Sequence, residues 1–193
     1  QGVDARWLSV VNDEGSALFK SRHLPAGAKA RPEYEGKLKE WVQLLHRKNV
    51  SVMSWYPLHL NRAAWAKHPD WRQRYLLASP GIRCMKLTCC INSPYGDALI
   101  DFIIEALQKF DLDGFWFDGS AFSPIWQLPQ PVSCICRHCR AKFKQATGLE
   151  LPARLDWNLP EFRRWVQWRF DMHAGYWQRL VDAVHKVVPQ AAL

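Results

Sequence analysis

One segment of the sequence ends on a carboxylate that could act as a nucleophile. Phe115-Trp116-Phe117-Asp118-Gly119 is an apolar run closed by an acidic residue. In an extended strand Trp116 and Asp118 would point to one face, because side chains alternate along a strand. An aromatic wall beside a carboxylate suits stacking on a sugar ring, and it can shift the carboxylate pKa. The segment therefore makes Asp118 a candidate catalytic residue. The alternative is that Asp118 caps the following loop or pairs with an arginine.

A second segment has the residue types and spacing of a metal site. Three of the six cysteines, Cys134, Cys136 and Cys139, fall within six residues. Six cysteines in 193 residues are too few for a disulfide scaffold, so their clustering indicates a metal in a reducing compartment. Zinc takes four tetrahedral ligands when its role is structural, and Cys90 is the best candidate for the fourth. The alternatives for that ligand are Cys89, Cys84 and His138. Buried thiols without a metal are the other interpretation.

Four cysteine ligands would leave zinc no open coordination position. We therefore expect a structural zinc and no catalytic role for it. The sequence indicates no organic cofactor.

Aromatic and polar residues also follow the other two apolar runs. Asn12 and Asp13 come after the first run, and Trp55, Tyr56 and His59 lie at the end of the second. Aromatic faces combined with hydrogen-bonding groups suit carbohydrate, whose rings have apolar faces and hydroxyl edges. Taken singly, each of these residues is more often explained by packing in the core or in a loop.

Hydrophobic periodicity predicts the elements that must position these residues. Short apolar runs predict strands at residues 5–11, 50–56 and 113–119. Amphipathic stripes predict helices at residues 33–48, 97–110, 137–147 and 161–188. Residues 58–95 contain no long regular pattern before the second helix, and we expect a long irregular connection there. Residues 120–133 are rich in proline and are expected to form a loop.

Alternating strands and helices predict an α/β fold with a parallel sheet covered by helices. Short strands that each lead into a polar or aromatic loop favour a (β/α)8 TIM barrel. Only three strands are visible, and 193 residues is short of the roughly 250 that are typical of that barrel. We therefore expect a single incomplete barrel segment over residues 1–193, with three to four parallel strands. A small three-stranded α/β unit is the alternative.

The chain termini are consistent with a segment of a longer protein. The N-terminus has no Met and no targeting signal, and the chain stops where a further strand would begin. We expect a cytoplasmic protein without a membrane partner, because no run of 18 apolar residues occurs. The sequence is compatible with a homo-oligomer formed through the parent protein.

The formal net charge of +8 raises the question of nucleic acid. The basic residues are scattered over the outer faces of the predicted helices, and no block of five like charges occurs. This distribution favours a solvated surface over a phosphate-binding face, so a nucleic-acid partner is disfavoured.

Several stretches together resemble the barrel glycoside hydrolases, and most closely the hypothetical glycosyl hydrolase 6 family. The resemblance extends from about residue 5 over nearly the whole chain. The stretches that carry it are residues 45–50, 68–71, 90–95 and 111–119, and the Cys134, Cys136 and Cys139 cluster with Arg140 and Phe143.

Two further families are similar in single segments. The Asn-Ser-Pro sequence after Cys90, with the later C-x-C-x2-C spacing, resembles the zinc cluster of glycoside hydrolase family 42 β-galactosidases. That resemblance implies Cys90 as the fourth ligand in place of Cys89. The Trp-Phe-Asp-Gly strand end is similar to the nucleophile strand of family 29 α-L-fucosidases, which implies Asp118 as the nucleophile. The turn at residues 12–15 lies where fucosidases place sugar contacts. The fucosidase histidine pair is absent, so fucose specificity is not implied.

The resemblance implies a retaining glycoside hydrolase of which this segment alone would be inactive. The sugar contacts expected at the strand ends are Trp116, Tyr56, Trp55, Asn12, Asp13 and His59. A second carboxylic acid is needed; Asp13 and Glu14 are candidates, and a residue on a later strand is favoured. The zinc would join the loop at residues 84–95 to the loop at residues 130–140. The alternative function is a zinc-stapled, non-catalytic module that binds carbohydrate or nucleic acid.

Overall fold

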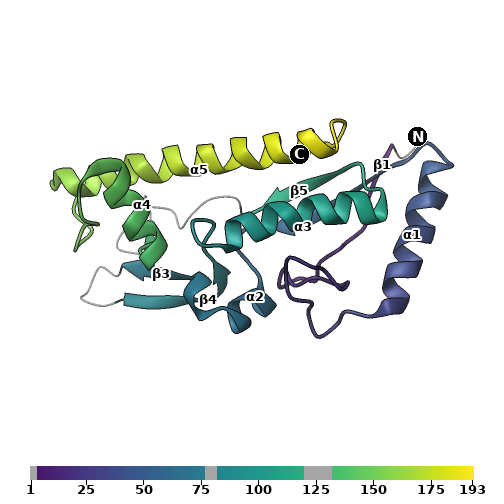
Figure 1. The fold of residues 1–193 in the computed structure, drawn as a ribbon, viewed down its shortest axis with the longest axis horizontal. Helices are drawn as coiled ribbons and strands as arrows, with labels where there is room; N and C mark the ends of the chain where they lie inside the picture. The colour runs from purple at the N-terminus through teal and green to yellow at the C-terminus, as the bar shows by residue number, and fades with distance from the viewer. Residues whose placement is uncertain (1–3, 77–81, 120–131) are drawn as a thin grey trace.

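A parallel β-sheet lies at the centre of the fold in the computed structural model (Figure 1). The structure describes residues 4–76, 82–119 and 132–193, without the side chains of residues 82–85. The three strands of the sheet are β1 (Ala5–Trp7), β2 (Ser51–Pro57) and β5 (Gly114–Asp118). They lie in the order β1-β2-β5, and Ala192 adds a parallel bridge to Gly114 at the β5 edge. The prediction of three parallel strands is confirmed.

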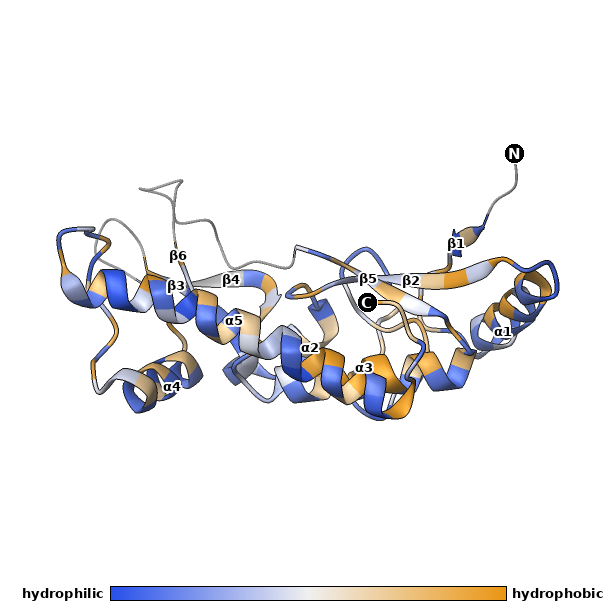
Figure 2. Cartoon of the chain, turned by 90° about the horizontal axis from the view of Figure 1, so that it is seen from above, coloured by the Kyte–Doolittle hydropathy of each residue, from blue (hydrophilic) through white to orange (hydrophobic). Residues whose placement is uncertain are grey.

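Three helices lie against one face of this sheet. They are α1 (Pro32–His46), α3 (Tyr95–Phe110) and α5 (Pro160–Val187). Figure 2 shows α3 and α5 on the same side of β2 and β5. Both α1 and α5 begin at a proline, whose fixed φ suits the first helical position. The predicted helices are confirmed, with ends shifted by two residues or fewer.

Side-chain alternation along β2 and β5 separates the two faces of the sheet. Val52, Ser54 and Tyr56 are fully buried, and the Tyr56 ring packs against Phe102 of α3. The opposite face carries Trp55 and Trp116, which lie side by side in the register of β2 and β5. Trp116 is 53% exposed. The helices therefore cover the Tyr56 face, and the tryptophans lie on the other one.

A second, antiparallel sheet follows the C-terminal ends of β2 and β5. Its strands, in the order β4-β3-β6, are β4 (Ile82–Cys89), β3 (Arg72–Leu76) and β6 (Val132–Ser133). The helical elements beside it are α2 (Arg62–Lys67), the 3-10 turn η1 (Pro69–Trp71) and α4 (Arg137–Thr147). The chain segments that follow β2 and β5 therefore pair with each other and form one antiparallel unit.

The structure corrects two sequence-based expectations. Residues 58–95 were expected to form an irregular connection, but they contain α2, η1, β3 and β4. β3 has the sequence Arg-Gln-Arg-Tyr-Leu without apolar alternation, and it forms because β4 and β6 pair with its two edges. The first strand, predicted over residues 5–11, ends at Trp7. Val10 N–H donates to the Ser54 hydroxyl at 3.1 Å, so the chain has left the backbone ladder there.

Helix α5 runs beside both sheets (Figure 1). Its 28 residues correspond to a length of about 42 Å. Near its start the Trp168 ring contacts Phe143 of α4, and further on the Tyr176 hydroxyl donates to the Gly96 carbonyl of α3. The helix therefore joins the antiparallel unit to the parallel one. Within the described part of the chain, neither α5 nor any other helix is long and apolar enough to span a membrane.

Candidate metal centre and candidate active site

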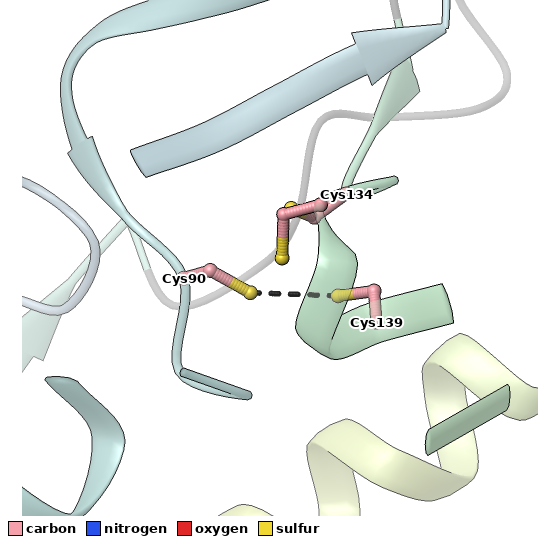
Figure 3. A group of neighbouring side chains, drawn as sticks. Cys90, Cys134 and Cys139 are labelled. Carbon is pink, nitrogen blue, oxygen red and sulfur yellow. Dashed lines mark hydrogen bonds between the residues drawn. The ribbon is translucent and has the colours of Figure 1, made fainter. Parts of the chain in front are cut away.

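Four cysteines from three chain segments meet in the antiparallel unit. Cys90 directly follows β4, Cys134 directly follows β6, and Cys136 and Cys139 lie at the start of α4. Their sulfur atoms all lie within 4.8 Å of one another. Figure 3 shows the side chains of Cys90, Cys134 and Cys139 pointing toward one another. The four residues selected from the sequence are therefore brought together.

The dimensions of this cluster fit a tetrahedral metal centre. The Cys90 and Cys139 sulfurs are 3.4 Å apart, and the four residues are at most 2% exposed. Zinc–sulfur bonds of about 2.3 Å in a tetrahedron would separate the sulfurs by about 3.8 Å. Cys89, an alternative fourth ligand, is buried outside the group, and its thiol donates to the Asn61 carbonyl oxygen at 3.9 Å. The Cys84 side chain lies outside the described residues.

Burial and hydrogen bonds inside the cluster change the pKa values of its thiols in opposite directions. Burial raises the pKa of Cys90 and of Cys139, and hydrogen bonds with Cys134 and Cys136 raise both further. Hydrogen bonds from Cys134, Cys139 and Cys90 lower the pKa of Cys136. A bound divalent cation would displace the shared protons and allow four thiolates to coexist.

Two residues that the sequence did not single out lie against the cluster. The Asn92 side-chain amide donates to the Cys139 sulfur at 3.3 Å. Arg169 of α5 is only 6% exposed, and its guanidinium lies over the Trp165 ring at 5.2 Å. Burial lowers the pKa of Arg169 to about 10, and the charges of Cys134 and Cys139 oppose that change. An amide donor and a buried cation both suit a negatively charged thiolate centre.

The candidate nucleophile lies at the end of the parallel sheet. Asp118 is exposed, pairs with Pro57 in the register of β2 and β5, and follows Trp116 on the same face. Its Oδ1 accepts a hydrogen bond from Gly119 N–H at 2.6 Å. The Trp7 ring lies 5.6 Å from the Trp116 ring, and both side chains are about half exposed. The carboxylate therefore stands beside an open aromatic surface.

Trp7 is a member of this surface that sequence reasoning missed. No sufficient signal for it existed in the sequence, because the first strand was predicted to run to residue 11, whereas the structure ends β1 at Trp7. For Arg169 the signal was a charge placed on the apolar stripe of a helix, four residues after Trp165 and seven before Tyr176.

Asn12 and Asp13 lie in the turn that follows β1. The Asn12 side-chain oxygen accepts hydrogen bonds from Glu14 N–H and Ser16 N–H, at 3.1 and 2.9 Å. Asp13 is exposed, with Lys29 Nζ 3.9 Å from its carboxylate. Glu14, which was a candidate acid together with Asp13, pairs with Arg62 at 2.6 Å. Asn12 therefore shapes the turn, and Asp13 faces solvent.

The structure contradicts the expectation that Tyr56 lines a sugar subsite. Tyr56 is 0% exposed, and its hydroxyl lies 3.2 Å from the Tyr95 hydroxyl on the helix side of the sheet. Consecutive residues of a strand face opposite ways, so Tyr56 cannot share the face of Trp55. His59 is 7% exposed and packs 6.1 Å from the ring of His173 on α5. This burial contradicts a direct sugar contact by His59 as well.

The fold is that of a mixed α/β protein, with a parallel sheet whose helices cover one face. It combines an acidic and aromatic strand end with a four-cysteine cluster that is a candidate metal centre. Residues 3–119 match the family described as hypothetical glycosyl hydrolase 6. This match covers more than half of the chain, and the chain belongs to that family. No curated protein matches the chain.

Two solved structures show the same fold at low sequence identity. Alpha-L-fucosidase isoenzyme 2 from Paenibacillus thiaminolyticus is similar with a TM-score of 0.66 and 22% identity, over 97% of this chain and 26% of the fucosidase. A hypothetical protein from Ruminiclostridium thermocellum ATCC 27405 is similar with a TM-score of 0.50 and 11% identity, over 89% of this chain and 80% of that protein. The chain thus spans about a quarter of the fucosidase length. The similarity to a fucosidase expected from the sequence is confirmed at the level of the fold.

Proposed function

We propose that this chain is the nucleophile-bearing segment of a glycoside hydrolase that cleaves a glycosidic bond with retention of configuration. The observation that carries the proposal is Asp118, an exposed carboxylate at the C-terminal end of a parallel strand beside the Trp7–Trp116 pair. Barrel enzymes hold their catalytic groups at that end of their strands. Membership of a glycosyl hydrolase family and the fucosidase-like fold support the same assignment.

In the proposed reaction Asp118 attacks the anomeric carbon and the bond to the glycosidic oxygen breaks. A second carboxylic acid gives its proton to the leaving oxygen, and a covalent glycosyl-enzyme forms. That same group, now a carboxylate, takes a proton from water while the water oxygen attacks the anomeric carbon, and the bond to the Asp118 oxygen breaks, which releases the sugar and restores the Asp118 carboxylate. The two carboxyl groups should be about 5–5.5 Å apart. Because Glu14 already pairs with Arg62, we favour an acid from a further strand of the full-length protein.

The tryptophans provide a surface for the sugar. Trp7 and Trp116 are tilted by 57° and about half exposed, so their faces can receive the apolar side of a pyranose ring. Trp55 lies next to Trp116 on β2 and contributes to the base of the same surface. Asp13 offers a carboxylate to sugar hydroxyls from the turn after β1.

We propose that the parallel sheet is part of a (β/α)8 barrel and that residues 1–193 form one incomplete domain of it. The bridge from Ala192 to Gly114 supports this proposal, because it adds a fourth parallel position after α5 in the order that a barrel requires. The tryptophan face would then be the interior of the barrel, and α1, α3 and α5 its outer layer.

The metal in this proposal is zinc with a structural role. Cys90, Cys134, Cys136 and Cys139 would be its four thiolate ligands, which leaves no position for water or substrate. The zinc would supply a cross-link between the segment that follows β4 and the start of α4. Asn92 and Arg169 would stabilise the negative charge of the centre.

The test uses the full-length protein and a panel of aryl glycosides. Asp118→Asn should abolish turnover, and Asp118→Gly supplied with azide should form a glycosyl azide, because azide replaces the missing nucleophile. Asp171→Asn is the matched control, since Asp171 is an exposed carboxylate of α5 that accepts a hydrogen bond from the Gln167 side chain. Turnover by Asp118→Asn at the rate of the control would refute the nucleophile assignment.

A non-catalytic, zinc-stapled carbohydrate-binding module is the second candidate. The observation in its favour is that the two acids in the turn after β1 already face cations, with Asp13 near Lys29 and Glu14 paired with Arg62. The two functions differ in one result. A binding module would show carbohydrate-dependent quenching of tryptophan fluorescence in the full-length protein, without turnover of any glycoside.

A further inference from the structure

His59 joins the segment that carries Cys90 to the end of the parallel sheet. Cys89, the residue before that candidate ligand, donates its N–H to the His59 carbonyl at 2.7 Å. The His59 Nδ1 lies 3.3 Å from the Cys89 carbonyl oxygen, so the ring donates a second hydrogen bond through Nδ1–H. His59 therefore bonds to both backbone groups of Cys89, and the Gln73 side-chain amide donates to the same Cys89 carbonyl at 3.2 Å.

The neighbour of His59 makes the next contact toward Asp118. Leu58 N–H donates to the Asp118 carbonyl at 3.0 Å, and the Leu58 carbonyl accepts the Tyr95 hydroxyl at 2.9 Å. Leu58 is fully buried. Cys90, Cys89, His59, Leu58 and Asp118 thus form a continuous series of covalent links and hydrogen bonds.

The surroundings of His59 fix its ring from the other side. The ring packs against His173, which lies on α5 three residues before the next aromatic of the stripe, Tyr176. The same helix carries Arg169, one turn earlier, toward the cysteine cluster. An enclosed ring on a rigid helix is suited to fixing geometry, since it has little freedom to move.

We propose that His59 is a positioning residue through which the metal-loaded cysteine cluster fixes the Asp118 strand end. This inference rests on the proposed function, because it assumes both the metal and the role of Asp118. A bound metal would hold Cys90 in place, His59 would pass that constraint to Leu58, and Leu58 would hold the Asp118 carbonyl. The metal would then affect the candidate nucleophile without contacting it.

Amide hydrogen exchange measured by NMR tests the proposal in this chain. The protein is prepared with one equivalent of Zn²⁺, and its metal content is measured before and after treatment with a chelator. Leu58 N–H reports the bond to Asp118. Ala192 N–H is the matched control, because it bonds to Asp113 at 2.8 Å at the opposite end of β5. Chelation should raise Leu58 exchange at least tenfold and Ala192 exchange less than twofold.

Two variants separate the contribution of the His59 ring hydrogen bond from that of the His59 backbone hydrogen bond. His59→Leu fills the buried site without an Nδ1–H donor, and with zinc still bound its Leu58 exchange should match that of the chelated wild type. His59→Asn places an amide N–H near the position of Nδ1, and it should restore the protection of Leu58. Gly119 N–H, which bonds to the Asp118 carboxylate, should change its chemical shift in His59→Leu and not in His59→Asn.

Several outcomes would overturn the proposal. If the Leu58 amide of zinc-loaded His59→Leu exchanges within twofold of the wild-type rate, the His59 ring has no positioning role. An equal rise at Ala192 on chelation would mean global loosening in place of positioning. If His59→Leu does not fold, chelation of the wild type decides alone, and unchanged Leu58 exchange refutes the proposal. Absence of bound zinc from the wild type would instead refute the metal assignment, and the inference with it.

Discussion

Replacing Cys90 and replacing Cys89 should have very different effects, although the two cysteines are adjacent. Both side chains are 0% exposed, and only Cys90 belongs to the four-sulfur group. Cys90→Ala and Cys89→Ala each remove one buried sulfur, so they share the packing cost. Cys90→Ala also removes a zinc ligand. The difference between the two variants therefore isolates the contribution of the metal.

The size of that difference follows from mass action. A ligand present at about 1,000 times its Kd stabilises the folded state by about 4 kcal/mol. For a chain of this length, each kcal/mol changes Tm by roughly 2–4 °C. Cys90→Ala should therefore melt roughly 8–16 °C below Cys89→Ala when zinc is present. With a chelator in excess the two variants should melt within a few degrees of each other.

Metal analysis and thermal unfolding followed by circular dichroism measure both quantities on the same samples. Wild type and Cys89→Ala should contain close to one zinc per chain, and Cys90→Ala should contain little. Equal zinc content and equal Tm in the two variants would refute the four-cysteine centre. A loss of zinc in Cys89→Ala alone would show that the fourth ligand is Cys89.

The remaining predictions concern pH, a buried acid and the aromatic surface. Burial lowers the pKa of His59 to about 3, so below pH 6.5 the unfolded chain binds a proton that the folded chain does not. This group alone should lower the free energy of unfolding by about 1.4 kcal/mol per pH unit from about pH 6.5 toward pH 3, and urea titrations of His59→Asn should show a shallower fall. Glu105 is 8% exposed and accepts hydrogen bonds from Ser21 and Arg22, so Glu105→Ala should cost about 1–3 kcal/mol in urea unfolding. Trp7→Ala should leave Tm nearly unchanged and weaken carbohydrate binding about 2- to 10-fold by fluorescence titration; unchanged affinity would remove Trp7 from the surface.

The elements that the sequence predicted well are those whose pattern is local. Helix α3 has apolar residues at helical spacing, and its predicted range of 97–110 differs from Tyr95–Phe110 by two residues at the start. The cysteine cluster was also predictable, since C-x-C-x2-C places three thiols at the start of one helix whatever the rest of the fold does. Asp118 was placed correctly at a strand end because the apolar run before it is unambiguous.

The elements that the sequence could not predict depend on distant partners. β3 is a strand because β4 and β6 pair with it. Its sequence, Arg-Gln-Arg-Tyr-Leu, has no apolar alternation that would predict either pairing. The burial of Tyr56 could have been predicted, because side-chain alternation along β2 places Tyr56 and Trp55 on opposite faces. For His59 no local signal existed, since its enclosure depends on His173, more than 100 residues later in α5.

The composition of the antiparallel unit argues that the metal is a requirement of its stability. In α4 the buried residues are Cys139 and Phe143 alone, and in β3 they are Gln73 and Leu76. These two elements thus bury few side chains of their own, whereas α3 buries ten residues. Small units with so little apolar core commonly need a metal or disulfides to fold. Removal of zinc should therefore unfold α4 and the antiparallel sheet first and leave α1, α3 and the parallel sheet formed. The contacts of His59 lie on the boundary between the two, so that boundary is where the loss of the metal would reach Asp118.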